Sequence, residues 1–193
     1  GRCGTWLALE HEGVVADIVA VAKGLAGGYI PLAATIFNRD IAATIAQAHG
    51  SVLTGHTFSG HTAACAAGLA VQRIIERDQL LERTRTRGAL LRAELDQALR
   101  DIDSVGDIRG RGYFIGIELV QDRASKTPFP EQRGLSQEIA ACAFADGLIC
   151  FPCAGNAGGG LGDALIVAPP YNASDAELAE LIEKLSRAIR HSI

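Results

Sequence analysis

One lysine beside three glycines is the group in this 193-residue sequence that is best suited to chemistry. The apolar run from Ile18 to Ala22 ends in Lys23, and Gly24, Gly27 and Gly28 follow it. An apolar run of this length, bounded by turn residues, is typical of a buried strand, so we expect Lys23 at the end of one. Burial disfavours the charged form of an amine. An uncharged amine can attack a carbonyl and form an imine.

The alternative interpretation is a lysine whose ammonium group reaches solvent and takes no part in chemistry, as is common at strand ends. Composition favours the chemical role. The chain has 15 arginines but only Lys23, Lys126 and Lys184 as lysines. A cation needed only for structure would more often be an arginine in such a sequence, and arginine cannot form an imine.

The segment from Thr54 to His61 is the second candidate, because it is rich in hydroxyl, imidazole and glycine groups. If Lys23 holds an aldehyde cofactor, the anionic end of that cofactor needs hydroxyls and free N–H groups, which a helix start provides. The alternative is that Ser59 or Thr62 only caps the following helix. His56 and His61 are candidate general bases or, alternatively, ordinary loop histidines.

Composition and charge exclude several classes of function. The chain is 48% hydrophobic and 21% charged, as in ordinary globular proteins. A net charge of −4 gives no basic surface for nucleic acid or for an anionic membrane. There is no apolar run of the ~18 residues that a membrane span needs, and we expect no signal peptide. We therefore expect a soluble, cytoplasmic protein with neither nucleic acid nor membrane as a partner.

Five scattered cysteines favour reduced, buried thiols over a disulfide framework. Cys150 and Cys153 form a C-x-x-C pattern, which raises the alternative of a redox site or a metal site. A redox pair should open a helix, but the glycine-rich segment 154–162 follows instead. No second Cys or His pair stands at zinc spacing, so we expect no metal.

The elements that must position these residues divide the sequence after residue 78. We expect an end of a larger α/β domain in residues 1–78 and a small α+β domain in residues 79–193. The first part should contain strands around Lys23 and helices after Asn38 and over 62–77. The longest helix should run from an Asp78 cap to about residue 100. Beyond it we expect strands at 105–109, 113–120, 148–151 and 165–168, helices at 131–145 and after a Ser174 capping box, and a loop at 154–162.

The order of several short motifs closely resembles the class III aminotransferases, which are pyridoxal-phosphate enzymes of fold type I. The resemblance covers essentially the whole chain, and the lysine and His-Thr-Phe segments are its most specific parts. The motifs are Gly1-Arg-x-Gly4, Glu10-His-Glu-Gly-Val-Val15, Ala22-Lys-Gly-Leu-x-Gly-Gly-Tyr-x-Pro-Leu32, His56-Thr-Phe-Ser-Gly-His61, Arg109-Gly-x-Gly112 and Ala168-Pro-Pro170.

The resemblance implies an α/β fold in which this chain is the C-terminal portion: the end of the large cofactor domain plus the small domain. It implies that Lys23 forms the Schiff base with pyridoxal 5'-phosphate. It also implies that Thr57 and its neighbour Phe58 bind the cofactor, Thr57 reaching the phosphate of the partner subunit in a homodimer. The implied reaction is a transamination between a small-molecule amine and a keto acid.

Two departures from the family pattern shape the expected activity. An acidic residue, a phosphate loop and a stacking aromatic would all precede Gly1, so we expect weak or no turnover from this chain alone. Members that act on α-amino acids carry an arginine in the strand before Pro169, where this sequence has Ile166. An apolar side chain cannot hold a carboxylate, which favours amines or ω-amino acids with pyruvate-like acceptors. Arg109 and Arg111 remain candidate carboxylate partners or residues that fix the domain junction.

Three alternatives stay open at this point. An aminomutase or a decarboxylase would keep the same fold and the same lysine. A non-catalytic chain would use its small domain only in assembly.

Overall fold

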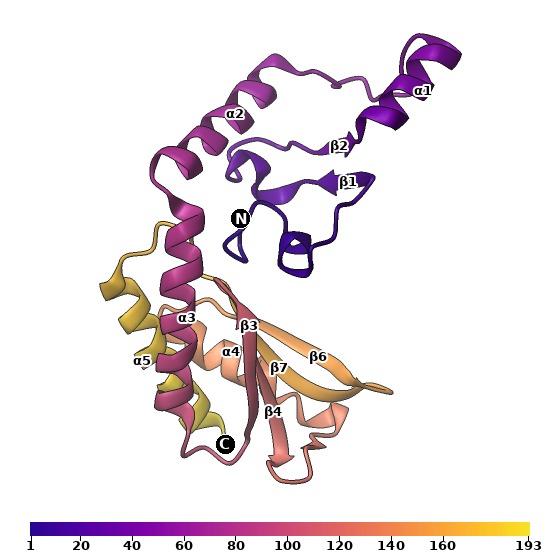
Figure 1. The fold of residues 1–193 in the computed structure, drawn as a ribbon. Helices are drawn as coiled ribbons and strands as arrows, with labels where there is room; N and C mark the ends of the chain where they lie inside the picture. Colours follow the sequence, from indigo (N-terminus) through magenta and orange to yellow (C-terminus); the bar gives the residue numbers. More distant parts are fainter. The chain divides into compact units, whose positions relative to one another are not determined.

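The computed structural model describes every residue from Gly1 to Ile193 and divides into two compact units (Figure 1). One unit is Leu9–Leu80, and the other joins Gly1–Ala8 to Leu81–Ile193. We call them the lysine unit and the C-terminal unit. The sequence placed the division after residue 78 and left the first eight residues with the lysine. The assignment of 1–78 to the end of a cofactor domain stays a prediction.

The lysine unit contains short strands and two α-helices. Its elements are η1 (Ala8–Glu12), β1 (Ile18–Val21), η2 (Lys23–Ala26), β2 (Ala34–Phe37), α1 (Arg39–His49) and α2 (Thr62–Arg77). β1 and β2 pair antiparallel, Ile18 opposite Phe37 and Val21 opposite Ala34. Asn38 caps α1 by accepting from the N–H of Ile41 at 2.9 Å, as the sequence predicts.

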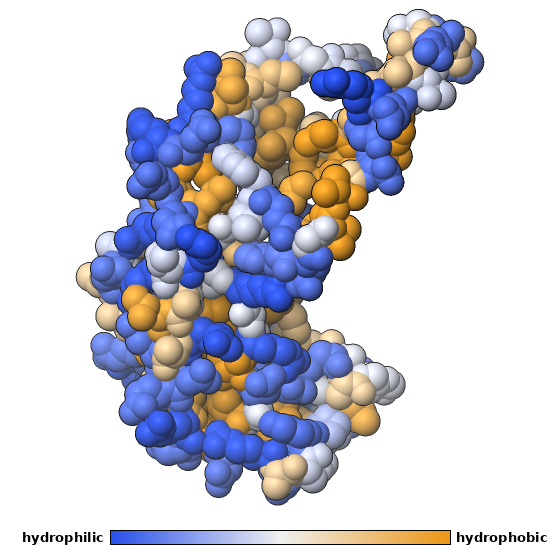
Figure 2. Space-filling view, viewed as in Figure 1, coloured by the Kyte–Doolittle hydropathy of each residue, from blue (hydrophilic) through white to orange (hydrophobic).

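The expectation that Lys23 ends a buried strand is wrong for this chain. β1 has no buried residue, and Lys23 itself is exposed. The physical reason is that β1 and β2 form a sheet of only two strands, which leaves apolar side chains such as Ile18 and Ile36 more than half exposed. Figure 2 shows hydrophobic surface gathered over this part of the unit.

The C-terminal unit is built on a five-stranded antiparallel sheet in the order β3-β4-β7-β6, with β5 paired to β4. Its elements are α3 (Leu80–Leu99), β3 (Val105–Arg111), β4 (Phe114–Asp122), β5 (Thr127–Pro128), η3 (Glu131–Arg133), α4 (Leu135–Ala145), β6 (Phe151–Gly158), β7 (Leu161–Val167) and α5 (Asp175–Ser192). This is the small α+β arrangement that the sequence predicts.

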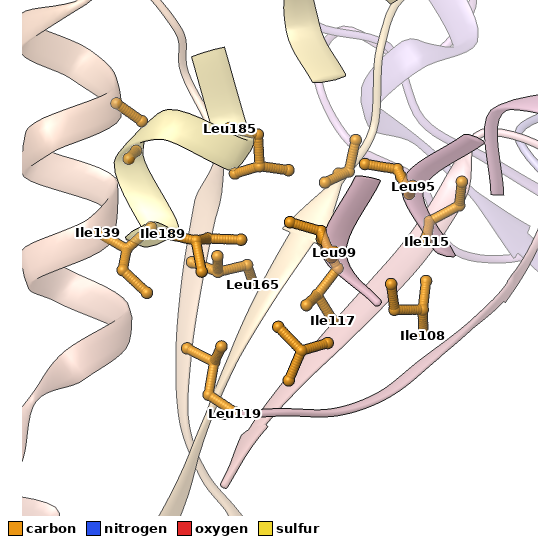
Figure 3. Packing of buried hydrophobic residues seen from close by; sticks show 14 of the residues in the cluster. Leu95, Leu99, Ile108, Ile115, Ile117, Leu119, Ile139, Leu165, Leu185 and Ile189 are labelled. Carbon is orange, nitrogen blue, oxygen red and sulfur yellow. The ribbon is translucent and has the colours of Figure 1, made fainter. Parts of the chain in front are cut away.

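Three helices cover one face of this sheet and bury the core between them (Figure 1). Figure 3 shows Leu95 and Leu99 of α3 beside the isoleucines of β3 and β4, and Ile189 of α5 beside Ile139 and Leu165. α5 begins with the predicted capping box, in which Ser174 and Glu177 satisfy each other's N–H groups. Its buried stripe includes Leu178, Leu185 and Ile189.

The glycine-rich segment 154–162 is not the loop that the sequence predicts. β6 continues through it to Gly158, and β7 starts at Leu161, so that the segment forms the end of a long hairpin. Pairing to a neighbouring strand overrides the weak strand preference of glycine. None of the helices is both long enough and apolar enough to cross a membrane.

Candidate functional site

Lys23 stands at the junction of β1 and η2 in an unusual backbone conformation. Its φ angle is +55°, and only Gln79 and Lys126 among the other non-glycine residues have positive φ. The left-handed region costs a residue with a Cβ roughly 1–2 kcal/mol. Such strain persists only where surrounding structure holds it, and it concentrates at functional sites. The side chain makes no hydrogen bond or ion pair in the structure, so its Nζ is available to a ligand.

Helix α2 holds the turn that carries Lys23. The amide of Gln72 donates to the carbonyl oxygen of Leu25 at 3.0 Å, and Ala26 is fully buried. A Cβ on Gly68 would lie 2.6 Å from Leu32, and one on Gly27 would lie 3.1 Å from Val71. Small residues at these contacts therefore let α2 pack closely against η2 and Leu32.

Thr57 lies at the corner of a double turn just before α2. The N–H of Ser59 donates to the carbonyl of His56 at 2.9 Å, and the N–H of His61 donates to that of Phe58 at 3.1 Å. The Ser59 hydroxyl accepts from the N–H of His56 at 2.9 Å and closes the first turn. Thr57 is exposed, and its hydroxyl has no partner in the structure. A free hydroxyl on a tightly turned backbone is suited to an anionic oxygen.

His61, and neither Ser59 nor Thr62, caps α2. Its Nδ1 accepts from the N–H of Ala64 at 3.2 Å. Its ring also meets that of Phe58 edge to face, with centroids 5.9 Å apart and planes at 64°. Sequence reasoning missed this role because histidine is not among the preferred cap residues. The only local signal was its position directly before the helix.

The lysine and the threonine are thus anchored on one helix, η2 against its middle and the double turn at its start. Residues 68–72 lie six to ten positions beyond Thr62, which is about 9 to 15 Å along the helix axis. In Figure 1 the segment between β1 and β2, which contains η2, lies beside α2, and the chain from α1 enters the start of that helix. The arrangement offers an amine and a hydroxyl that are available to a ligand on one scaffold. The roles of Lys23, Thr57 and Phe58 remain predictions.

Arg109 is already held by two carboxylates. Its Nη1 lies 2.6 Å from Glu118 and 2.8 Å from Asp107, and these hydrogen bonds raise the pKa of the guanidinium. The arginine belongs to a cross-strand row in which Gly116 separates it from Ile166. Its charge is therefore compensated within β3 and β4, which argues against a substrate carboxylate as its partner.

Cys150 and Cys153 are both free thiols. Residues three apart along an extended chain point to opposite faces, and only Cys150 packs against the hydrophobic core. Burial raises the pKa of the Cys150 thiol, which disfavours the reactive thiolate. The geometry does not support a redox pair at this position.

Comparison with known proteins places these observations in a family. The chain matches the family described as "Aminotransferase class-III" over residues 1–189. It is 39% identical over 189 residues to an uncharacterized aminotransferase, YodT, of Bacillus subtilis, covering 98% of this chain and 43% of that protein. It is 38% identical over 192 residues to the adenosylmethionine-8-amino-7-oxononanoate aminotransferase of Nitratidesulfovibrio vulgaris, covering 98% of this chain and 34% of the relative.

Solved structures agree. The fold superposes on a thermostable (S)-enantioselective omega-transaminase from Thermomicrobium roseum with a TM-score of 0.88 and 35% identity, covering 100% of this chain and 41% of that one. The chain spans about two fifths of the length of the curated relatives it matches. The expected α/β fold, the C-terminal part of an aminotransferase, is confirmed.

Proposed function

This chain belongs to the class III aminotransferases, and from that premise we propose that it serves pyridoxal 5'-phosphate-dependent transamination. In this proposal an amino group moves from an amine or an ω-amino acid to a keto acid such as pyruvate. The alternatives on the same scaffold, an aminomutase or a decarboxylase, would be recognised by their products.

The observation that carries the proposal is the backbone of Lys23. Positive φ at a lysine is costly, and a lysine needed only as a surface cation could sit at any unstrained position nearby. The strained residue carries an exposed amine beside glycines that leave room for a ligand; a Cβ built on Gly24 or on Gly28 meets no atom within 4 Å.

The residues present fit the cofactor that the family implies. Pyridoxal 5'-phosphate, when bound, supplies an aldehyde for the amine and a ring that withdraws electrons. Lys23 would hold its aldehyde end, because a primary amine in its uncharged form condenses with a carbonyl and no other side chain occupies this one. Thr57 would hold the phosphate of the partner subunit's cofactor through its free hydroxyl. Nζ of Lys23 can also take up and return a proton.

The substrate preference rests on Ile166 and Arg109. Ile166 stands where the resemblance expects an arginine in members that bind an α-carboxylate. Arg109 lies in the same cross-strand row, with Gly116 between it and Ile166. Its guanidinium already pairs with Glu118 and Asp107. Because Ile166 carries no charge and the charge of Arg109 is compensated, we propose amino donors that have no α-carboxylate beside the reacting amine.

The proposal includes a homodimer in which Thr57 and Phe58 serve the cofactor of the partner subunit. It is supported by the apolar surface of the lysine unit, where Val15, Tyr29, Leu53 and Phe58 are each more than three quarters exposed. Exposed apolar patches of this kind mark interaction sites. A reducing compartment such as the cytoplasm suits the five free thiols.

The test is whether Lys23 takes up the cofactor. Pyridoxal 5'-phosphate should give a visible absorption band, and borohydride should then fix the pyridoxyl group on the peptide that contains Lys23. Lys23→Arg should abolish the label, because arginine keeps the charge but cannot condense with the aldehyde. Lys126→Arg is the matched control, since Lys126 also has positive φ (+57°). A label that survives Lys23→Arg would refute the proposal.

Substrate profiling then tests the donor class. Amines and ω-amino acids should convert pyruvate to alanine faster than ornithine-type α-amino acids do. A preference for α-amino acids would contradict the role given to Ile166. Carbon dioxide release or a rearranged amine in place of a keto product would favour the alternatives.

A further inference from the structure

We propose that His61 is a positioning residue that fixes Thr57 for the cofactor phosphate by linking the start of α2 to the ring of Phe58. The inference rests on the proposed function, because Thr57 is the phosphate ligand only there. It adds a residue that makes no contact with the cofactor and acts through two neighbours.

His61 belongs to the turn and to the helix at once. Its N–H donates to the carbonyl of Phe58, and its own carbonyl accepts from the N–H of Cys65 at 3.0 Å. Its Nδ1 accepts a hydrogen bond from the N–H of Ala64, which is one of the donors that a helix start leaves without a partner in the helix. This bond requires the ring proton to be on Nε2. Any tilt of the imidazole therefore moves both the turn and the first helical residues.

The ring adds a contact that an ordinary cap could not provide. Asparagine or serine would satisfy Ala64 equally well, but neither reaches an aromatic side chain. The edge-to-face contact restrains Phe58, a residue that is 77% exposed. Phe58 directly follows Thr57, so the contact restrains the residue that the proposal places against phosphate.

Gly60 makes this linkage sterically possible. Its φ of +74° places it in the left-handed region at the third position of the turn Phe58–His61, as a type II turn requires. The chain thereby reverses, so that His61 faces back toward Phe58. The two turns and the cap form one connected unit from His56 to Ala64, with the Thr57 hydroxyl at its free corner.

The experiment measures how much the phosphate adds to cofactor affinity, with the assembled enzyme first freed of bound cofactor. Pyridoxal 5'-phosphate and pyridoxal, which lacks the phosphate, are titrated against each variant. The readout is the dissociation constant of pyridoxal divided by that of pyridoxal 5'-phosphate, a ratio that falls when a phosphate contact is lost. A merely destabilised protein loses affinity for both, so its ratio stays constant. Thr57→Val reports the direct ligand, and His49→Asn, at the end of α1, is the control.

Two variants separate the two contacts of His61. His61→Asn keeps a cap acceptor but removes the ring, and His61→Phe keeps a ring but removes the acceptor. Each should lower the ratio by about threefold to tenfold, the range for one aromatic pair or one cap. Thr57→Val should lower it at least as much, and His49→Asn should leave it unchanged.

A second measurement needs no cofactor. Amide hydrogen exchange should show faster exchange at Ala64 in His61→Phe and wild-type protection in His61→Asn, because only the first loses the cap. Exchange at Ser59 and at the amide of position 61 should rise in both variants, because either change loosens the double turn. Wild-type protection of these two amides in both variants would overturn the inference.

The failures of the two proposals are distinguishable. A normal ratio in either His61 variant, beside a lowered ratio in Thr57→Val, overturns the role of His61 and leaves the proposed function intact. A normal ratio in Thr57→Val overturns the assignment of Thr57 to the phosphate, and the inference built on it falls as well.

Discussion

Arg2 and Tyr113 hold each other through both backbone and side chain. The N–H of Tyr113 donates to the carbonyl of Arg2 at 2.9 Å, and Nη1 of Arg2 donates back to the carbonyl of Tyr113 at 3.2 Å. The same nitrogen reaches the carbonyl of Pro169 at 3.0 Å, and the guanidinium lies 5.2 Å from the ring centroid of Tyr171. Two motifs that suggested the family, Gly1-Arg-x-Gly4 and Ala168-Pro-Pro170, therefore meet within the C-terminal unit, beside the residue that follows the third, Arg109-Gly-x-Gly112.

Arg2→Met should loosen the attachment of residues 1–8 to the rest of the C-terminal unit. The substitution keeps the apolar stem but removes two hydrogen bonds and the contact with Tyr171, which should cost about 1 to 3 kcal/mol of unfolding free energy. Urea unfolding measures the loss, and emission from Trp6, the only tryptophan, reports the segment directly. Arg92→Met, an exposed residue of α3, should change stability by less than about 0.5 kcal/mol. Equal effects of both variants would contradict the role of Arg2.

Gly88 of α3 lies against the backbone of Gly112, and a Cβ there would be 2.4 Å from the Gly112 carbonyl oxygen. Alanine in a helix is favoured over glycine by about 1 kcal/mol, but a backbone atom cannot move aside. We therefore expect Gly88→Ala to destabilise the protein by about 1 to 3 kcal/mol net.

Gly68→Ala is the matched comparison for this prediction. Its Cβ would meet the end of the flexible Leu32 side chain, which can change rotamer, so that the helix preference nearly offsets the crowding. Chemical denaturation gives the change in unfolding free energy for both variants and so shows whether steric crowding or the helix preference of alanine is larger at each position. A stabilised Gly88→Ala protein would show that α3 and Gly112 are not held this closely.

Elements whose residues carry their own local signal could be predicted from the sequence. The Asn38 cap, the span of α2 and the Ser174 capping box are set by residues within one helical turn of each other, and the structure reproduces them. Asp78 is the exception. It ends α2 and pairs with Arg77 at 2.6 Å, because Gln79 with positive φ separates it from α3.

The rest depends on partners that the sequence does not place. The continuous apolar run from Ile18 to Ala22 could not reveal that β1 has only β2 beside it, so Lys23 was expected in a buried position. The left-handed backbone at Lys23 had no local signal, since Gly24 next to it is the residue that tolerates such angles. The hairpin through segment 154–162 depends on pairing between β6 and β7, which outweighs glycine composition.

Asp163 shows the same limitation and leads to a prediction. This buried carboxylate of β7 accepts from the N–H and the hydroxyl of Ser136 at 2.9 and 2.7 Å. It serves α4 as a cap from another element, because Gly134 at the helix start has no side chain to offer. Asp163→Ala should leave the buried N–H of Ser136 without an acceptor and its hydroxyl with only the side-chain oxygen of Gln137, at 3.0 Å, and cost about 1 to 3 kcal/mol.

A double-mutant cycle tests this cap. If Asp163 acts through Ser136, then Ser136→Ala and Asp163→Ala together should cost less than the sum of the two single changes in thermal or urea unfolding. Strict additivity would show that the two residues do not interact. Asp163→Asn, which retains an acceptor oxygen, should lose less stability than Asp163→Ala.

Asp175 at the start of α5 should give the C-terminal unit a pH-dependent stability. Arg87 donates to its carboxylate at 3.0 Å and Arg83 at 3.3 Å. The hydrogen bond from Arg87, together with the charges of both arginines, holds the pKa of Asp175 below its ordinary value of 3.8. A carboxyl whose pKa is lowered in the folded state stabilises the fold fully at a pH above its ordinary pKa. This contribution is lost as the pH falls through the lowered, folded-state pKa.

The difference in unfolding free energy between wild type and Asp175→Asn should therefore be constant from neutral pH to about pH 5 and then shrink toward pH 2. Asp103→Asn, at an exposed carboxylate without a hydrogen bond or ion pair in the structure, is the control and should show a smaller change across this range. A gap for Asp175→Asn that widens on acidification would reverse the sign of the linkage and contradict the ion pair.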